Sequence, residues 1–311
     1  MALTLVEAAK LSQDTFLLGV VETIIKDSPI LQRLPFIEVV GNGLTYNQEK
    51  TLPSISFYDV GDPWVESTPT FEQKTATLKI MGGDADVDNF LKTTRSNLQD
   101  LEASVIELKA KALRHKFEET FIYGNTATNP KEFNGLRKLI DTATASSQVI
   151  MTAAGVAGGA GGALAFTDLD KLIDAILGGK PDMLLMSKRS LRKIKALMMG
   201  AGVLAVPTQD AFGNSVTEWN GVKLYTSDWI LDTHTVAGGV EGITTGEANS
   251  VIYAFQMGEG ALAGLTAPGH MQVEVLGSLE TKDASRTRIK WYVSLALFAS
   301  IKAAALIGVQ D

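Results

Sequence analysis

Apolar residues repeat at helical spacing along one long stretch, from Ser96 to Gly124. They recur at steps of three and four and then continue one position over, at Leu98, Leu101, Val105, Leu108, Ala112, Leu113, Phe117 and Phe121. Ser96 with Gln99 has the spacing of a capping box, and Gly124 is the expected left-handed stop. The pattern predicts a helix over 96–123, about 40 Å long. A helix of that length can act as a spine along which other elements lie.

Between Gly41 and Gly83 the pattern changes from helical to alternating. Glycine-containing turns bound segments such as TFEQKTATLKIM, in which polar and apolar residues alternate as in a strand. We predict a two-stranded arm over 44–82 with a polar tip. An isolated hairpin is marginally stable in water. An arm with large aromatic side chains therefore lies against a partner subunit or against its own domain, and the pattern leaves both open.

The segments that flank these two elements differ from each other in composition. Residues 3–26 have the apolar spacing of a helical arm that is broken near Gly19, and Ser28-Pro29 ends it before an extended stretch. Residues 141–166 are rich in glycine, alanine and serine and are typical of a mobile loop.

From Thr167 onward the pattern is that of an α/β block. Thr167 and Ser187 have the positions of helix caps, and the stretch from Asp182 to Ser187 has the apolar run of a buried strand. Further strands are predicted at 221–225, 250–257, 272–276 and 286–309. Taken with the long helix, these elements indicate an α+β fold.

Composition narrows the chemistry that the chain can perform. Its 311 residues include no cysteine, which excludes disulfides and thiolate sites. They include only three histidines, which disfavours histidine-based catalysis and metal binding. A net charge of -7 argues against a dedicated nucleic-acid binder. The N-terminus has no signal-peptide pattern. The stretch from Trp291 to Val309 is as long as a membrane span, but Lys302 interrupts it, and we expect no membrane segment.

Three patterns resemble functional sites, and each has a simpler interpretation. The stretch from Gly258 to Ala263 matches GxGxxA, but Pro268 leaves no room for the helix of a dinucleotide fingerprint. The alternating aspartates of 84–88 lack the glycine and glutamate of a calcium loop, and Asp86 and Asp88 are expected in the turn toward the long helix. His115 with Glu118 is expected on a solvated helix face. We predict no catalytic, cofactor-binding or metal-binding residue.

Several segments, in their order along the chain, resemble the HK97-type major capsid proteins of tailed bacteriophages. MALTLVEAAKL with ILQRLPFIEVVGNGLTYNQE is similar to the N-terminal arm of that family, and PSISFYDVGDPWVESTPTFEQKTATLKIMGGDADVD is similar to its extended loop. ETFIYGN followed by PKEFNGLRKL resembles the end of the spine helix and the turn after it. KPDMLLMSKRSLRKIKAL resembles a strand and helix of the axial domain, and RTRIKWYVSLALFASIKAAALIGV resembles later strands. The resemblance covers nearly the whole chain.

The resemblance implies an HK97-like α+β fold in five parts. These are an N-terminal arm at 1–43, an extended loop at 44–82, a peripheral domain at 83–140 with the spine helix at 96–123, an axial domain at 141–265, and C-terminal strands at 266–311 that return to both domains. The extended loop would lie over a neighbouring subunit. The residues expected in that contact are Tyr46, Glu49, Lys50, Phe57, Tyr58, Trp64, Glu66 and Phe71.

The resemblance also implies a non-enzymatic structural protein of the virion capsid, assembled in the cytoplasm of a bacterial host. Its pentamers and hexamers would close into an icosahedral shell around double-stranded DNA, which is contacted without sequence specificity. Because the sequence opens directly at the arm, either a separate scaffolding protein or unaided assembly is expected, with a portal and, in some systems, decoration proteins. Two alternatives stay open: an encapsulin-type shell that stores a cargo enzyme, and a nucleotide-using enzyme based on 258–263.

Overall fold

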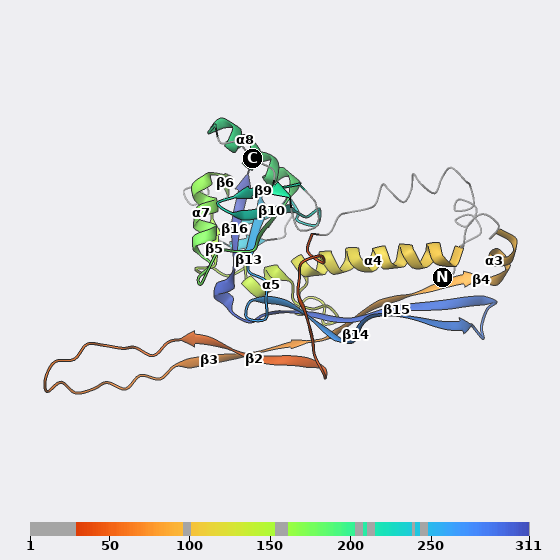
Figure 1. Ribbon diagram of the computed structural model, residues 1–311, viewed down its shortest axis with the longest axis horizontal. Helices are drawn as coiled ribbons and strands as arrows, with labels where there is room; N and C mark the ends of the chain where they lie inside the picture. Colours follow the sequence, from red (N-terminus) through yellow and green to blue (C-terminus); the bar gives the residue numbers. More distant parts are fainter. Residues whose placement is uncertain are drawn as a thin grey trace.

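The computed structural model describes residues 29–95, 101–152, 161–202, 208–209, 215–237, 240–242 and 248–310. The helical arm predicted over 3–26 and the capping box predicted at Ser96 lie outside these residues. The described part is elongated. One long helix lies along a narrow sheet, a compact α/β block sits at one end, and a hairpin extends beyond it (Figure 1).

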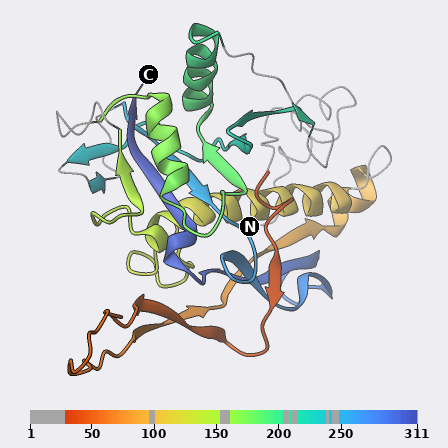
Figure 2. The same cartoon turned by 60° about the vertical axis from the view of Figure 1, so that its left-hand side comes forward.

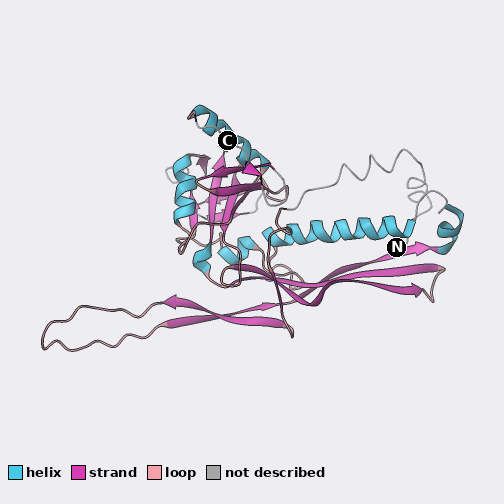
Figure 3. Cartoon of the chain, viewed as in Figure 1, coloured by secondary structure: helices cyan, strands magenta, loops and turns pink. Residues whose placement is uncertain are grey.

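The long helix and the narrow sheet form two layers. Helix α4 (Leu101–Tyr123) lies along a four-stranded sheet of order β1 (Phe36–Glu38), β14 (Leu262–Ser278), β15 (Ala284–Leu297) and β4 (Lys79–Asp88) (Figure 3). Strand β1 pairs in parallel with β14, and the other neighbours are antiparallel. The predicted strand at 272–276 is confirmed as part of the longer β14.

Alternation along β15 decides which face of the sheet the helix covers. Ile289, Trp291 and Val293 are buried in one core with Leu113 and Phe117 of α4. The residues between them point to the opposite face, because successive side chains of a strand alternate. The sheet is therefore apolar toward α4 and polar away from it.

The predicted apolar stripe of the long helix is confirmed in its C-terminal half. Leu113, Phe117 and Phe121 are buried, and the ring centroids of Phe117 and Trp291 are 5.0 Å apart. Leu108 and Ala112 are exposed. At 3.6 residues per turn Leu108 lies on the far side of the helix from Phe117, which the narrow sheet leaves uncovered. Ala112 lies at the edge of the helix–sheet contact, beside Gly82 and Gly83 of β4.

The α/β block is built on an eight-stranded sheet. Its strands run in the order β5 (Val149–Met151), β16 (Ala303–Gln310), β13 (Ser250–Phe255), β7 (Met183–Met186), β10 (Val222–Thr226), β9 (Ser215–Trp219) and β8 (Thr208–Gln209), with β6 (Gly162–Ala163) paired to β16. The central strands β7 and β13 are buried throughout, as expected for strands covered on both faces. The predicted loop at 141–166 thus contains two short strands, β5 and β6, that pair with β16.

Two helices flank this sheet, and Figure 2 shows α7 (Phe166–Asp174) against it beside β16. The predicted cap of α8 (Lys188–Gly200) is confirmed, since Ser187 Oγ accepts a hydrogen bond from the Ser190 backbone N–H at 3.2 Å. The predicted cap at Thr167 is wrong by two residues. Helix α7 begins after Ala165, whose N–H donates to Asp168 Oδ2 at 3.3 Å.

The remaining elements are short. The predicted strand at 286–309 is divided, because residues 300–302 turn the chain from the narrow sheet into the larger one. The other described elements are α3 (Asn89–Arg95), α5 (Leu136–Ile140), the 3-10 helix η1 (Ser300–Lys302), the ribbon of β11 (Thr235–Ala237) with β12 (Val240–Gly242), and the arm of β2 (Gly43–Thr51) with β3 (Thr70–Thr77). Within the described ranges, no helix has both the length and the apolar character to cross a bilayer.

Two glycines close the turn after the long helix by direct contact. Gly135 N–H donates to Gly124 O at 2.8 Å, and a Cβ on Gly124 would lie 2.3 Å from Phe133 O and 2.5 Å from Thr120 O. The predicted left-handed conformation at Gly124 is wrong, since its φ is not positive. Glycine is needed here because backbone segments approach too closely for a side chain, so the direction in which the chain leaves α4 depends on it.

Gly124→Ala should destabilise the fold by about 1–3 kcal/mol, the range of overpacking substitutions in a close-packed interior. The added methyl group meets backbone oxygens, which cannot move aside as a flexible side chain does. Thermal unfolding followed by circular dichroism measures the effect. Gly200→Ala is the control, because a Cβ there meets nothing within 4 Å and glycine is unfavourable in a helix. Equal stability of the two variants would contradict the close-contact explanation.

Candidate assembly surfaces

The arm of β2 and β3 is attached to the body at its base. Gln48 is buried and its Nε2 donates to Leu297 O at 2.6 Å. The Tyr46 ring packs against Phe298 with 5.0 Å between centroids, and burial raises the pKa of the Tyr46 hydroxyl. Strands β2 and β3 then carry the arm away from the body (Figures 1 and 3). The arm is therefore held at one end and projects at the other.

The tip of the arm, residues 52–69, is apolar and acidic. Apolar side chains that are more than two-thirds exposed gather there: Leu52, Ile55, Phe57, Val60, Trp64 and Val65. The same residues include three acidic side chains and no lysine or arginine. The predicted polar tip is thus wrong. A surface of this kind is typical of a binding site for another protein rather than of a solvated loop.

Contacts within the tip hold its two strands of loop together. The rings of Tyr58 and Trp64 stack with centroids 4.5 Å apart, and the Val65 N–H donates to Tyr58 OH at 3.2 Å. Ser54 N–H donates to Ser67 Oγ at 2.9 Å across the two strands of the loop. The tip therefore presents its apolar side chains from a bridged loop.

The eight predicted contact residues fall into different environments. Tyr46 packs on its own chain at the base of the arm, as described above. Glu49 and Phe71 are exposed and lie opposite each other across the strands. Phe57, Tyr58, Trp64 and Glu66 belong to the tip, and the side chain of Lys50 lies outside the described ones. The structure thus gathers four of the predicted residues at one projecting end.

Sequence reasoning missed four members of the same exposed patch. Leu52, Ile55, Val60 and Val65 stand beside the predicted aromatics in the tip. The segment SISFYDV at 54–60 alternates like a strand, which hid this patch, but the structure has no strand there. Its apolar side chains are exposed instead of facing a core.

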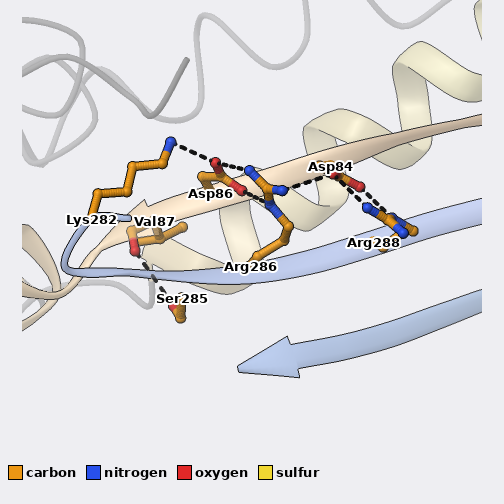
Figure 4. Close-up of polar contacts among 7 residues, drawn as sticks. All are labelled: Asp84, Asp86, Val87, Lys282, Ser285, Arg286 and Arg288. Atoms are coloured by element: carbon orange, nitrogen blue, oxygen red, sulfur yellow. Dashed lines mark hydrogen bonds and ion pairs between the residues drawn. The ribbon is translucent and has the colours of Figure 1, made fainter. Parts of the chain in front are cut away.

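A ladder of ion pairs covers the polar face of the narrow sheet (Figure 4). Arg286 and Arg288 of β15 lie directly opposite Asp86 and Asp84 of β4. Each pair is bidentate, with N–O distances of 2.6 and 2.8 Å for Arg286 with Asp86 and of 2.7 and 3.0 Å for Arg288 with Asp84. Lys282 Nζ adds a contact of 2.8 Å to Asp86. The ladder ties β4 to β15 through side chains as well as backbone.

These contacts fix the charge of the two aspartates. Hydrogen bonds from Arg286 and Lys282 hold the pKa of Asp86 well below its usual range, and the Arg288 guanidinium lowers the pKa of Asp84. The prediction that Asp86 lies in a turn is wrong, because Asp86 is paired with Arg286 within strands β4 and β15. Asp88 ends β4, and its Oδ1 accepts from Phe90 N–H at 2.8 Å to begin α3. Over the described ranges, no cluster of three or more potential metal ligands occurs.

A buried polar network joins the end of the long helix to the α/β block. Tyr123 OH and His234 Nε2 are 2.8 Å apart, and Leu231 N–H donates to Tyr123 OH at 2.9 Å. His234 Nδ1 contacts Glu241, whose backbone oxygen accepts from Arg137 Nη2 at 2.9 Å. Burial raises the pKa of the Tyr123 hydroxyl. Because buried charges need their partners, this network restricts how the block can tilt on the helix.

The predicted solvated face at His115 and Glu118 is wrong. Glu118 is only 2% exposed and accepts a hydrogen bond from Trp229 Nε1 at 2.9 Å. The His115 ring lies beside the same tryptophan, with centroids 5.8 Å apart. The segment after β10 covers this side of α4, which no local pattern could have indicated.

The GxGxxA match at 258–263 leads into a strand. Residues 258–261 form a turn, and β14 begins at Leu262. A dinucleotide fingerprint requires a helix whose N-terminus meets the pyrophosphate. This segment therefore has the spacing of the fingerprint without its geometry.

The fold defined by these layers is that of capsid shells. The encapsulin of the holo-SrpI complex from Synechococcus elongatus PCC 7942 is similar with a TM-score of 0.71 and 20% identity, over 100% of this chain and 97% of that one. The capsid protein of cyanophage A-1(L) is similar with a TM-score of 0.70 and 10% identity, over 97% of this chain and 99% of that one. The capsid protein of a native GTA particle is similar with a TM-score of 0.65 and 13% identity, over 92% of each chain. The predicted HK97-like α+β fold is confirmed.

The sequence itself matches the family model of the major capsid protein GP7 over residues 12–169, just over half of the chain. The chain belongs to this family of major capsid proteins, and it is a capsid shell protein. No curated protein sequence matches it.

Asp86→Asn should lower the free energy of unfolding by about 1–3 kcal/mol at neutral pH, because Arg286 and Lys282 lose a charged acceptor. The folded pKa of Asp86 is depressed. Its contribution is therefore present above the pKa of an unfolded aspartate, about 3.9, and is lost as the pH falls through the lower folded value. Thermal melts across pH should show the two proteins converging below about pH 4.

The exposed arm residue Glu72 supplies the control for this series. Glu72→Gln removes one carboxylate from a site whose side chain is exposed, so its melting temperature should follow the parent at every pH. A constant offset between Asp86→Asn and the parent down to the lowest pH would show that the ladder is not the source of the difference.

Proposed function

We propose that the chain forms rings of five and six copies that close into an icosahedral shell around double-stranded DNA. Membership of a major capsid protein family supports this proposal. Head-to-tail contacts that close at a set rotation produce rings, and rings of two sizes produce a closed shell. The net charge of -7 also suits a shell whose wall binds the DNA phosphates only weakly.

The observation that carries the proposal is the exposed apolar tip of the arm. Phe57 and Val60 are fully exposed and Trp64 is 83% exposed. Such side chains contribute to binding when they are buried by a partner, and the arm projects them away from its own body. A neighbouring subunit of the shell is the partner, contacted through Phe57, Tyr58, Trp64 and Glu66, with Glu49, Lys50 and Phe71 along the sides of the arm. Tyr46 anchors the arm on its own subunit.

The same proposal assigns roles to the parts of the chain. Residues 1–43 form the N-terminal arm and 44–82 the extended loop. The layer of α4 on the narrow sheet supports a peripheral domain at 83–140, and the eight-stranded sheet supports an axial domain at 141–265. Residues 266–311 return to both, because β15 belongs to the narrow sheet and β16 to the larger one.

We further infer that the protein acts without catalysis, by assembly alone. Its partners are a separate scaffolding protein, a portal and, in some systems, decoration proteins, and assembly takes place in the cytoplasm of a bacterial host. Family membership supports these assignments. Electron microscopy of the purified protein is the direct test: rings or shells support the proposal, and a persistent monomer with catalytic turnover would end it.

A second candidate function is an encapsulin-type compartment. The similarity to the Synechococcus elongatus encapsulin, over 100% of this chain, favours it. Particle contents separate the two candidates. Nuclease-resistant double-stranded DNA inside particles from the natural host supports the phage shell, whereas a co-purifying protein cargo without DNA supports the compartment.

Replacing residues 50–72 by a short glycine-serine link should leave a folded subunit that builds no stable shell. The base of the arm keeps Tyr46 and Gln48 on the body, so the core is untouched. Circular dichroism checks the fold, and sedimentation velocity checks assembly. Normal shells from this variant would show that the arm is not the element that joins subunits.

A single substitution gives a quantitative version of this test. Trp64→Ser should raise the protein concentration needed for assembly by about 30-fold, as expected for the loss of a contact worth about 2 kcal/mol. Trp64→Phe is the matched control, because it keeps an aromatic ring and should shift the threshold far less. Light scattering across a concentration series measures both, and identical thresholds for the two variants would contradict a buried role for Trp64.

A further inference from the structure

One edge of the narrow sheet is open along part of β14. Strand β15 pairs with one side of β14 from Leu262 to Ser278, whereas β1 covers the other side only at Gly264–Thr266. Along residues 271–275, no strand among the described ranges pairs with that other side. The backbone N–H and C=O groups that point outward there have no ladder partner, and such an edge is a template for another strand.

Two bulges bound the open stretch. The pairing with β15 shifts register between Thr266 and Met271, and again between Val275 and Gly277. Because a bulge bends its strand and interrupts the ladder, residues 271–275 are the part that offers a regular edge. This stretch contains no lysine, arginine or proline, which are the residues that commonly keep an edge strand unpaired.

The apolar side chains of this edge are exposed on the face of the sheet that carries α4. Val273 and Val275 lie opposite Ile289 and Thr287 of β15, which are both buried. Directly opposite residues share a face of a sheet, so the two valines are on the helix side. They are nonetheless 52% and 71% exposed. The helix therefore leaves this part of β14 uncovered, and burial of the two valines needs a second chain.

The stretch is complementary to a second copy of itself. In an antiparallel pair centred on Val273, this valine lies opposite its own copy and Gln272 lies opposite Glu274. The Gln272 amide can donate to the Glu274 carboxylate, whose printed partner in its own sheet is Lys290. A pair centred on Glu274 would instead place two carboxylates opposite each other, which is destabilising. Side-chain chemistry thus selects the register centred on Val273.

The position of the edge suits a contact between rings. Strand β14 leads from the α/β block toward the far end of the narrow sheet, so the open stretch lies away from the block (Figure 1). Where the block forms the axial domain of a ring, this stretch lies toward the rim. A ladder over 271–275 is far smaller than the roughly 20–30 residues a side of a stable interface. It is therefore too weak to hold two free subunits, and it acts where rings already place copies side by side.

We propose that the open edge of β14 pairs with the same edge of a second copy, antiparallel about Val273, and that this two-fold contact joins one ring to the next. A contact across a two-fold axis uses the same surface on both copies, as a strand paired with its own copy does. The inference rests on the proposed function for its place between rings, whereas the pairing follows from the edge itself.

Single cysteines test the pairing in the full-length chain, which has none of its own. Val273→Cys should convert most of the assembled protein to covalent dimers on mild oxidation. Residues directly opposite in a ladder have Cα atoms about 4.5–5.5 Å apart, and cysteines bridge within about 7 Å. Non-reducing electrophoresis measures the dimers, and electron microscopy of the same samples records the shells.

Val275→Cys is the matched control. Across the proposed axis its two copies are four residues apart along the strands, about 13 Å, which is too far for a disulfide. It should therefore form few dimers, although Val275 is the more exposed of the two valines. Circular dichroism checks that both variants fold. Equal dimer yields from the two variants would indicate random collision and would overturn the proposal.

A double variant tests the other edge of the sheet as the partner. Ile80 of β4 is 78% exposed, and a bond between Val273→Cys of one chain and Ile80→Cys of another would assign the open edge to a head-to-tail contact and overturn the proposal. Shells without the Val273→Cys dimer would overturn it too and leave the proposed function intact. The dimer in protein that builds no shell would support the pairing and count against the proposed function alone, and the absence of both would overturn both.

Discussion

The packing of Phe117 against Trp291 holds the long helix on the narrow sheet, and the rest of the structure depends on it. Phe36 joins the same cluster, at 5.5 Å from Trp291 and 6.2 Å from Phe117 between ring centroids. Three segments far apart in sequence are thus fastened through large rings, which bury more apolar area than any other side chains. A sheet covered on one face only has no second layer to stabilise it, so its other face is closed by the ion-pair ladder instead.

The α/β block and the arm are both attached at the same end of the long helix and narrow sheet, where α4 and β15 end (Figure 1). The contact of Gly124 with Gly135 and the network around His234 orient the block on the helix. Consecutive strands β15 and β16 then pass from one sheet to the other, so that the two layers share the C-terminal part of the chain. At the base of the arm, Gln48 and Tyr46 fasten the hairpin to the end of β15. The arm and block therefore keep a defined direction relative to the helix.

This arrangement leaves the exposed apolar area of a shell protein at the end of its arm. The apolar side chains of the tip, among them Phe57 and Trp64, are exposed in the single subunit, and Trp64 stacks on Tyr58 of the same loop. In the proposed shell a second copy buries these side chains, and the projecting arm places that contact at a distance from the body. The proposed function thus follows from where apolar area is left exposed.

Local periodicity in the sequence was enough to determine the long helix, the arm, the buried strand at β7 and the cap at Ser187, because each depends on neighbours within a few residues. Order along the chain was enough for the HK97-like fold. Only the tertiary structure decided that Asp86 forms an ion pair with Arg286 and that Glu118 is buried beside Trp229. It also decided that the backbone approaches Gly124 too closely for a side chain, and that the surface of the arm tip is apolar. The first two outcomes depend on partners about 100 to 200 residues away, and a sequence pattern does not report which distant segment will cover a given side chain. The other two depend on how closely the backbone approaches Gly124 and on which side chains of the arm are left exposed, which a pattern does not report either.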